Sequence, residues 1–476
     1  MGSRSRSQRR VPEWALRFLR KAGYEPDTCM AKRQGDWWSW YDCSSEFYAQ
    51  VDDSLRPYCE RHLTLRPARM VCEEFERLIL DGETQVGSPD AAMGAWLEER
   101  VPAVLASLPG FVGRYMAQGT GALAVELSGV LDGAAASPDA RARLRSYDAF
   151  ETVPLGAGGR ECAACAFVAP ASAGGRVYDQ VQVHEPDPAS GEYTVRTWLF
   201  ERGRAREPVM VDGVAPEVRT GSALPTFALA APAIANTYER YTPLGVSVFD
   251  DALDAVRAVD EAFDQFYWAM RLCRVRVFVD EQGVLRDKET DEPLFSDSVD
   301  AMMFTTLLGS VNDGVPLTVY NPDMRAEQLE RVLNLSLSVL SAKCGFGRGY
   351  FSFDRTSGGA APKTATEVVA DGSQLLRTVQ KHEAVLGACL SRALAGMWAA
   401  EAGSRSGSLV SEAPEVAVEW DDSVVEDTAS ERAMVKDDIA RGLCQPWIYP
   451  MRYYGMGEAE ARELTARLYA APGEGL

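Results

Sequence analysis

"PKTATEVVADGSQLLRTVQKHEAVLGACLSRALAGMWAAE", residues 362–401, predicts one long, uninterrupted helix. No proline follows its first residue, and Thr364 with Glu367 three residues later forms a capping box at which the helix should begin. At about 1.5 Å per residue a helix of this length spans roughly 55 Å, so a large body must pack beside it. Its apolar residues are spaced so as to keep one side buried: Val368, Leu375, Val379, Leu386, Leu390, Leu394 and Met397.

Composition and charge limit the possible functions. The chain has 476 residues, of which 46% are hydrophobic and 25% charged, as in folded proteins. At about 150 residues per domain, this length predicts roughly two to four units. The net charge of -20 disfavours a protein that grips nucleic acid tightly, because most of its surface repels phosphate. A surface past which DNA slides without adhering remains compatible with that charge.

The residues that usually carry catalysis or bind metals form no recognisable site. Ten cysteines are scattered along the chain, as is typical of reduced core residues in an intracellular protein. Cys162 and Cys165 in "CAAC" have ligand-like spacing, but a zinc site needs a second pair, which we do not find. His62, His184 and His382 fit neither a triad nor a metal motif. We therefore expect no enzymatic activity, no cofactor and no bound metal.

Two charged segments have more than one interpretation. Residues 1–11 hold four arginines and no signal-peptide core. They could touch nucleic acid, but a flexible, solvated basic arm is the favoured interpretation. No stretch of the sequence is long enough to span a membrane. The carboxylates of "WDDSVVED" could hold a divalent cation, or could simply be favoured there by the dipole of the helix predicted after them. These carboxylates are Asp421, Asp422, Glu426 and Asp427.

The chain alternates between helical and strand-like parts, which predicts the α+β class. Residues 12 to about 130 show mostly helical periodicity. From about 150 to 235 the period becomes two, and "RVYDQVQVHE" and "EYTVRTWLFERG" flank the turn "PDPASG", which predicts an antiparallel hairpin.

An amphipathic helix is predicted within 248–271, followed by a loop-rich, partly stranded segment at 280–320 and a further helix in "MRAEQLERVLNLSLSVLSAKCGFG" that stops at Gly345 and Gly347. On spacing alone the polar side of the first helix is a solvated acidic face. That face comprises Asp250, Asp251, Asp254, Asp260, Glu261 and Asp264. The glycines of "GFGRGYFSF" fit a helix stop and turn rather than a phosphate-binding loop, because the GK[ST] ending is missing.

After the long helix, residues 402–427 look like a flexible serine- and glycine-rich connector and a short strand. Small helices are predicted in 428–476. Thr428 and Glu431 form a second capping box there, and Gly442 stands at a helix end.

Four stretches of the C-terminal half resemble the portal proteins of tailed bacteriophages, in particular those of long-tailed phages and prophages of Gram-positive bacteria. They are "YTPLGVSVFDDALDAVRAVDEAFDQFYWAMRLCRVRVFV", "NPDMRAEQLERVLNLSLSVLSAKCGFGRGYFSFD", "KTATEVVADGSQLLRTVQKHEAVL", and "VEWDDSVVEDTASERAMVKDDIARGL" followed by "YYGMGEAEARELTARL". Together they cover roughly 236–470. The first half matches loosely, in its opening tryptophan-containing helix and in "RPARMVCEEFERLIL".

The resemblance implies a division of the chain. A wing would occupy 12–247, a first stem helix 248–271, a clip 272–322, a second stem helix 323–346 and a tunnel-loop region 347–363. A long wing helix at 364–401, a connector and wing strand at 402–427 and a helical crown at 428–476 would complete it. Thr356, Ser357, Gly358, Gly359 and Lys363 would belong to a loop that faces the channel, and the acidic face of the first stem helix would line it.

The resemblance implies that about twelve copies of the chain form a ring at one capsid vertex. Double-stranded DNA would pass through it without sequence-specific binding. The implied partners are the terminase large subunit, head-completion (adaptor) proteins, scaffold and the major capsid protein. The protein would reside in the virion, and in the host cytoplasm during assembly. Two alternatives stay open: a minor capsid or head-completion protein without a channel, and an enzyme with a metal at Cys162 and Cys165.

Overall fold

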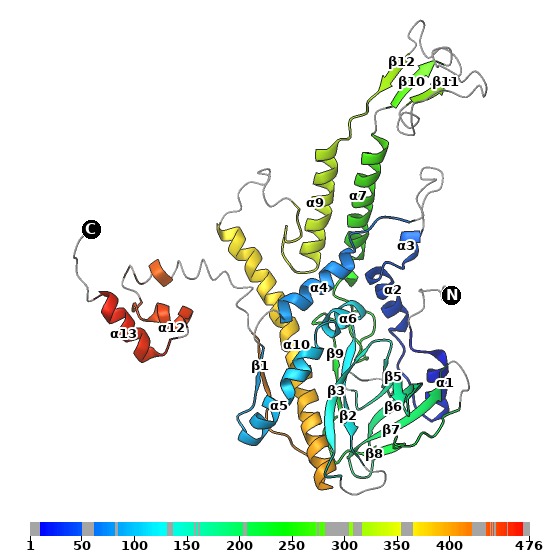
Figure 1. Cartoon of the computed structure of the whole chain (residues 1–476), viewed down its shortest axis with the longest axis vertical. Coiled ribbons are helices and arrows are strands. Elements are labelled where there is room, and N and C mark those ends of the chain that lie inside the picture. Colours follow the sequence, from blue (N-terminus) through cyan, green and yellow to red (C-terminus); the bar gives the residue numbers. More distant parts are fainter. Residues whose placement is uncertain are drawn as a thin grey trace.

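The computed structural model contains both helices and sheets, so the predicted α+β class is confirmed (Figure 1). A body of helices and sheets is crossed by one long helix, and a pair of helices projects from it. The structure describes residues 10–49, 61–80, 84–130, 137–156, 159, 162–202, 207–273, 276–280, 304–307, 317–353, 365–420, 435–437, 439, 441, 444–454 and 456–469.

The N-terminal part of the body is mostly helical up to Gln118, as its periodicity predicted, but the last part of the range assigned to helices forms the strand β2 (Gly121–Ser128). Helix α4 buries Val71, Phe75 and Ile79 in the main core, and α5 begins where the Asp90 carboxylate accepts a hydrogen bond from the Met93 N–H at 2.8 Å. The helices are α1 (Glu13–Lys21), α2 (Ala31–Tyr41), α3 (Glu46–Ala49), α4 (Pro67–Leu80), α5 (Ala91–Ser107) and α6 (Phe111–Gln118).

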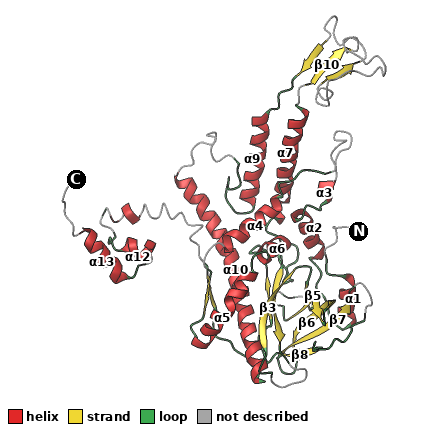
Figure 2. Ribbon diagram, viewed as in Figure 1, coloured by secondary structure: helices red, strands yellow, loops and turns green. Residues whose placement is uncertain are grey.

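Two antiparallel sheets follow the helices and face each other (Figure 2). The smaller has the order β3-β2-β9 and the larger β4-β5-β6-β7-β8. Tyr147 of β3 and Phe167 of β5 stack between them, with ring centroids 4.5 Å apart. The strands are β2 (Gly121–Ser128), β3 (Arg141–Asp148), β4 (Thr152–Leu155), β5 (Ala164–Ala173), β6 (Arg176–Pro186), β7 (Tyr193–Glu201), β8 (Glu217–Arg219) and β9 (Phe227–Ala230).

The predicted hairpin is present, with β6 paired to β7 from Tyr178 opposite Glu201 to Pro186 opposite Tyr193. Alternation along β6 separates its two faces. Val181 and Val183 pack in one cluster with α1, and Gln180 and Gln182 lie on the opposite face, toward the smaller sheet.

The helix pair that projects from the body consists of α7 (Leu253–Leu272), which follows the 3₁₀ turn η1 (Asp250–Ala252), and α9 (Ala326–Lys343). The two helices lie side by side, and we call them the stalk (Figure 1). A three-stranded sheet stands beyond their far ends, made of β10 (Arg276–Asp280), β11 (Phe304–Leu307) and β12 (Leu317–Tyr320). Strand β10 is central, parallel to β11 and antiparallel to β12.

The long helix is α10 (Ala365–Ser406), which has 42 residues and spans about 63 Å. It packs against α4, the smaller sheet and β13, and it buries Leu386, Leu390, Leu394 and Met397 as predicted. The capping box predicted at Thr364 and Glu367 lies outside the side chains that the structure describes.

The expectation of a flexible connector from residue 402 onward is wrong for its first five residues, because α10 continues through Ser406. Gly403 packs so closely on the loop at Gly221 that a β-carbon there would lie 2.2 Å from the Gly221 carbonyl oxygen. Ser404 is buried, and its hydroxyl donates to the Thr220 carbonyl oxygen at 3.1 Å. The small residues that suggested a linker instead allow close contact between helix and loop.

The short strand predicted after this segment is β13 (Ala417–Glu419), which pairs with β1 (Gln85–Gly87). Among the described residues near the C-terminus are two of the predicted small helices, α12 (Ile448–Tyr454) and α13 (Glu458–Tyr469). Thr428, Glu431 and Gly442 lie outside the described residues.

Candidate assembly and channel surfaces

The residues predicted to face the channel from the glycine-rich loop, Thr356, Ser357, Gly358, Gly359 and Lys363, lie outside the described residues. The segment leading to them is described and is well anchored.

Three glycines after α9, Gly345, Gly347 and Gly349, have positive φ angles, which makes "GFGRG" the predicted helix stop and turn. Phe346 is buried there and contacts the rings of Tyr350 and Phe351. The Tyr350 hydroxyl donates to the carboxylate of Glu74 in α4, which fastens this turn to the body.

The six carboxylates predicted on one solvated face differ in their exposure to solvent. Asp251 and Asp254 are exposed, and Glu261 is partly exposed and pairs with Arg257 at 2.8 Å. Asp250 is half-buried, and its carboxylate accepts hydrogen bonds from the Trp37 indole N–H and the Tyr238 hydroxyl, each at 2.7 Å.

Asp260 and Asp264 correct the prediction, because both are 0% exposed. The Asp260 carboxylate accepts hydrogen bonds from the Tyr48 hydroxyl at 2.7 Å, the Thr64 hydroxyl at 2.8 Å and the Leu65 N–H at 2.8 Å. Burial raises the pKa of Asp260 above its ordinary value, although these hydrogen bonds act in the opposite direction.

Asp264 accepts a hydrogen bond from the Leu63 N–H at 3.1 Å and lies 3.3 Å from Nδ1 of His62. The two carboxylates therefore attach the segment around residues 62–65 to the stalk. They cannot line an open passage, since their side chains are enclosed by their own chain.

Helix α9 carries a second surface that the sequence analysis missed. Leu333, Leu337 and Leu340 are buried against the rest of the chain. Val332, Leu335 and Val339 lie on the opposite side at a helical spacing of three and four, and are 51%, 66% and 45% exposed. We call these three residues the outer stripe. Its signal was in the sequence, because "LERVLNLSLSVL" is apolar around the helix rather than on one face.

His184 and His382 are buried in the body, where each lies within hydrogen-bonding distance of another residue of the chain. Nδ1 of His382 accepts a hydrogen bond from the Ala233 N–H at 3.1 Å, and burial, with Lys381 nearby, lowers the pKa of His382 to about 4. His184 is fully buried, with Nδ1 2.8 Å from the Thr226 hydroxyl, and burial lowers its pKa to about 3.

The Cys162 thiol donates to the Ala164 carbonyl oxygen at 3.0 Å. Within the described ranges, no group of three His, Cys, Asp or Glu side chains is placed to hold a metal ion. Asp421, Asp422, Glu426 and Asp427 lie outside those ranges.

No family model matches the chain, and no curated protein matches it. Of the helices that the structure describes, none is long and apolar enough to cross a membrane.

Proposed function

We propose that the protein is a portal-type subunit, many copies of which stand side by side in a ring that double-stranded DNA traverses during packaging and ejection. The observation that carries this proposal is the stalk with its outer stripe. An apolar surface opposite an already buried face is costly in water, and a neighbouring copy in a ring would cover it. The resemblance of residues 236–470 to portal proteins supports the same conclusion.

The negative charge of the chain suits a surface that DNA moves past rather than one that binds DNA tightly. Of the predicted face, Asp254 and Glu261 remain accessible on the stalk and Asp251 just before it, and the whole chain has a net charge of -20. Like charges repel the DNA backbone and keep it from adhering to the wall. In this proposal the protein catalyses nothing, and a separate terminase moves the DNA.

The proposed partners follow from the same arrangement. The sheet beyond the stalk, formed by β10, β11 and β12, would offer docking surface to the terminase large subunit and later to head-completion proteins. Scaffold and the major capsid protein would contact the body at the capsid vertex. The protein would then be part of the virion.

A packaging assay tests the proposal. The chain is assembled with the capsid, scaffold and terminase of the same virus, and nuclease-protected DNA is measured. We expect protected DNA with the wild type, and less with Gly358→Pro combined with Gly359→Pro, because proline restricts a loop that must yield to DNA. Rings of normal size without any protected DNA in the wild type would favour a head-completion protein.

A further inference from the structure

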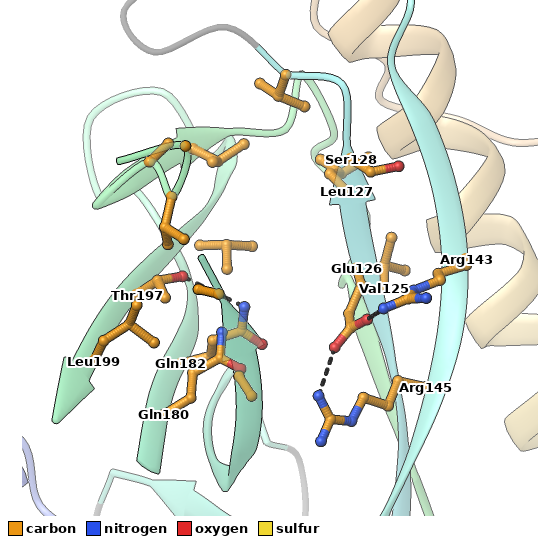
Figure 3. A pocket seen from close by; sticks show the side chains of 18 of the residues that line it. Val125, Glu126, Leu127, Ser128, Arg143, Arg145, Gln180, Gln182, Thr197 and Leu199 are labelled. Atoms are coloured by element: carbon orange, nitrogen blue, oxygen red, sulfur yellow. Dashed lines mark hydrogen bonds and ion pairs between the residues drawn. The ribbon is translucent and has the colours of Figure 1, made fainter. Parts of the chain in front are cut away.

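A cavity of about 510 Å³ lies between the two sheets of the body (Figure 3). The opposing polar faces of β6 and β7 contribute Gln180, Gln182 and Thr197. The other side is formed by β2 and by Arg143 and Arg145 of β3. The volume falls within the range of ligand-binding pockets.

One border of the cavity is an open strand edge. Strand β9 pairs with β2 over Gly121–Ala124, and the Val125 N–H donates to the Thr226 carbonyl oxygen at 2.8 Å. Beyond Val125, β2 continues to Ser128 with β3 as its one strand partner among the residues that the structure describes. Consecutive residues 125–130 line the cavity, so it is bordered by the edge of β2 rather than by one face.

The backbone of this edge is oriented for pairing. In a strand, the N–H and C=O groups of alternate residues point to the same side. The Val125 N–H points toward β9. The N–H and C=O groups of Leu127, two residues later, therefore point to the same side, into the space that β9 does not fill. An extended chain placed there could hydrogen-bond to β2.

The charges beside this edge favour an acidic occupant. Burial tends to raise the pKa of Glu126, but Arg145 at 2.9 Å and Arg143 at 2.6 Å outweigh it and lower the pKa, so this carboxylate is ionised at neutral pH. Both arginines share the Glu126 carboxylate, and Glu151 also acts on Arg145, so the least compensated positive charge is that of Arg143. Arg143 is 76% exposed and offers it to solvent, while Arg145 also donates to the Pro170 carbonyl oxygen.

Gln182, which lines the cavity from the larger sheet, can exchange its hydrogen-bond partners at small cost in free energy. Gln182 interacts with the Tyr147 and Thr197 hydroxyls at 3.4 Å each, which is long for a hydrogen bond. A bound backbone could therefore replace either interaction without leaving a strong bond broken.

We propose that this cavity binds an extended peptide segment of another polypeptide, added as a strand to the free edge of β2, with an acidic side chain at Arg143. Strand addition of this kind uses backbone hydrogen bonds for affinity and side-chain pockets for specificity. A small anion would use the arginines but would leave the Leu127 backbone groups unused, which makes a peptide the better occupant.

The test begins with nine-residue peptides displayed at random and selected on the full-length protein. The strongest binder is synthesised in a normal form and in a form N-methylated at alternate residues. Affinities are then measured by fluorescence anisotropy with wild type, Arg143→Glu and Arg20→Glu. Arg20 is exposed on α1, on the far side of the larger sheet, and provides a matched charge reversal.

We expect the selected peptides to carry Asp or Glu. N-methylation should weaken binding at least about tenfold, because it removes backbone donors. Arg143→Glu should weaken it about fivefold, as expected for reversal of an exposed charge, and Arg20→Glu should leave it unchanged. The proposal is wrong if the N-methylated form binds equally well, or if no selected peptide depends on Arg143. Competition by free glutamate as strong as that of the peptide would instead make the cavity a small-anion site.

Discussion

The carboxylate of Asp260 holds together parts of the chain that lie about two hundred residues apart in sequence. It receives hydrogen bonds from Tyr48, Thr64 and Leu65, and it is enclosed by them. Replacing it by alanine leaves buried donors without an acceptor.

We expect Asp260→Ala to lower the free energy of unfolding by roughly 3–5 kcal/mol. Asp254→Ala on the exposed side of the same helix should change it by less than about 0.5 kcal/mol. Urea denaturation of the two variants checks this difference, and equal effects would show that Asp260 is not an anchor.

His382 predicts a pH dependence of stability. Its pKa in the folded protein is about 4, below the ordinary value of 6.5, so the neutral form stabilises the fold. That contribution is fully present above about pH 6.5 and is lost as the pH falls toward 4. The loss should reach about 3 kcal/mol in the free energy of unfolding.

The matched variant is His382→Asn, whose side-chain oxygen can still accept from the Ala233 N–H but cannot be protonated. Urea unfolding at a series of pH values should show a shallower decline for this variant between pH 6.5 and 4. Identical declines in both proteins would mean that His382 is not the titrating group.

At the scale of the elements, periodicity was sufficient to predict α7, α9, α10 and the β6–β7 hairpin, because each has an apolar pattern that its own residues display. It could not predict that Asp260 and Asp264 are buried. Their partners at residues 48 and 62–65 are distant in sequence, and a helical pattern shows which side is polar but not what covers it.

Composition was misleading at residues 402–406 for a related reason. Serine and glycine are common in linkers, but they also permit close approach of backbones, and the packing at Gly221 decides between the two. The outer stripe of α9 was visible as excess apolar character, although no pattern in one chain identifies what packs against it.

The end of α10 gives a prediction about helix glycines. A β-carbon at Gly403 would collide with the backbone of Gly221, so Gly403→Ala should destabilise the protein by about 2 kcal/mol or more. The control is Gly94→Ala in α5, where the nearest atom is 3.8 Å away. There alanine should stabilise by up to about 1 kcal/mol through its helix propensity. Thermal unfolding measures the melting temperatures of both variants. Shifts of the two melting temperatures in the same direction would contradict the account.

At the scale of the whole molecule, the outer stripe predicts how assembly can be broken. Leu335→Glu places a charge in the centre of the stripe and should shift the protein from a large assembly to the 52.0-kDa monomer. Leu335→Met keeps the surface apolar and should leave the assembly intact. Light scattering after size-exclusion chromatography measures both masses. Assembly that survives Leu335→Glu would place the contact between copies elsewhere.

The central claim is that copies of this acidic chain close into a ring around an open axis, and electron microscopy of the purified wild-type protein, alone and co-expressed with its scaffold, tests it most directly. We predict end-on views with rotational symmetry and a central hole wide enough to admit duplex DNA. Particles that are monomeric under both conditions, or rings whose axis is closed in every class, would contradict the account.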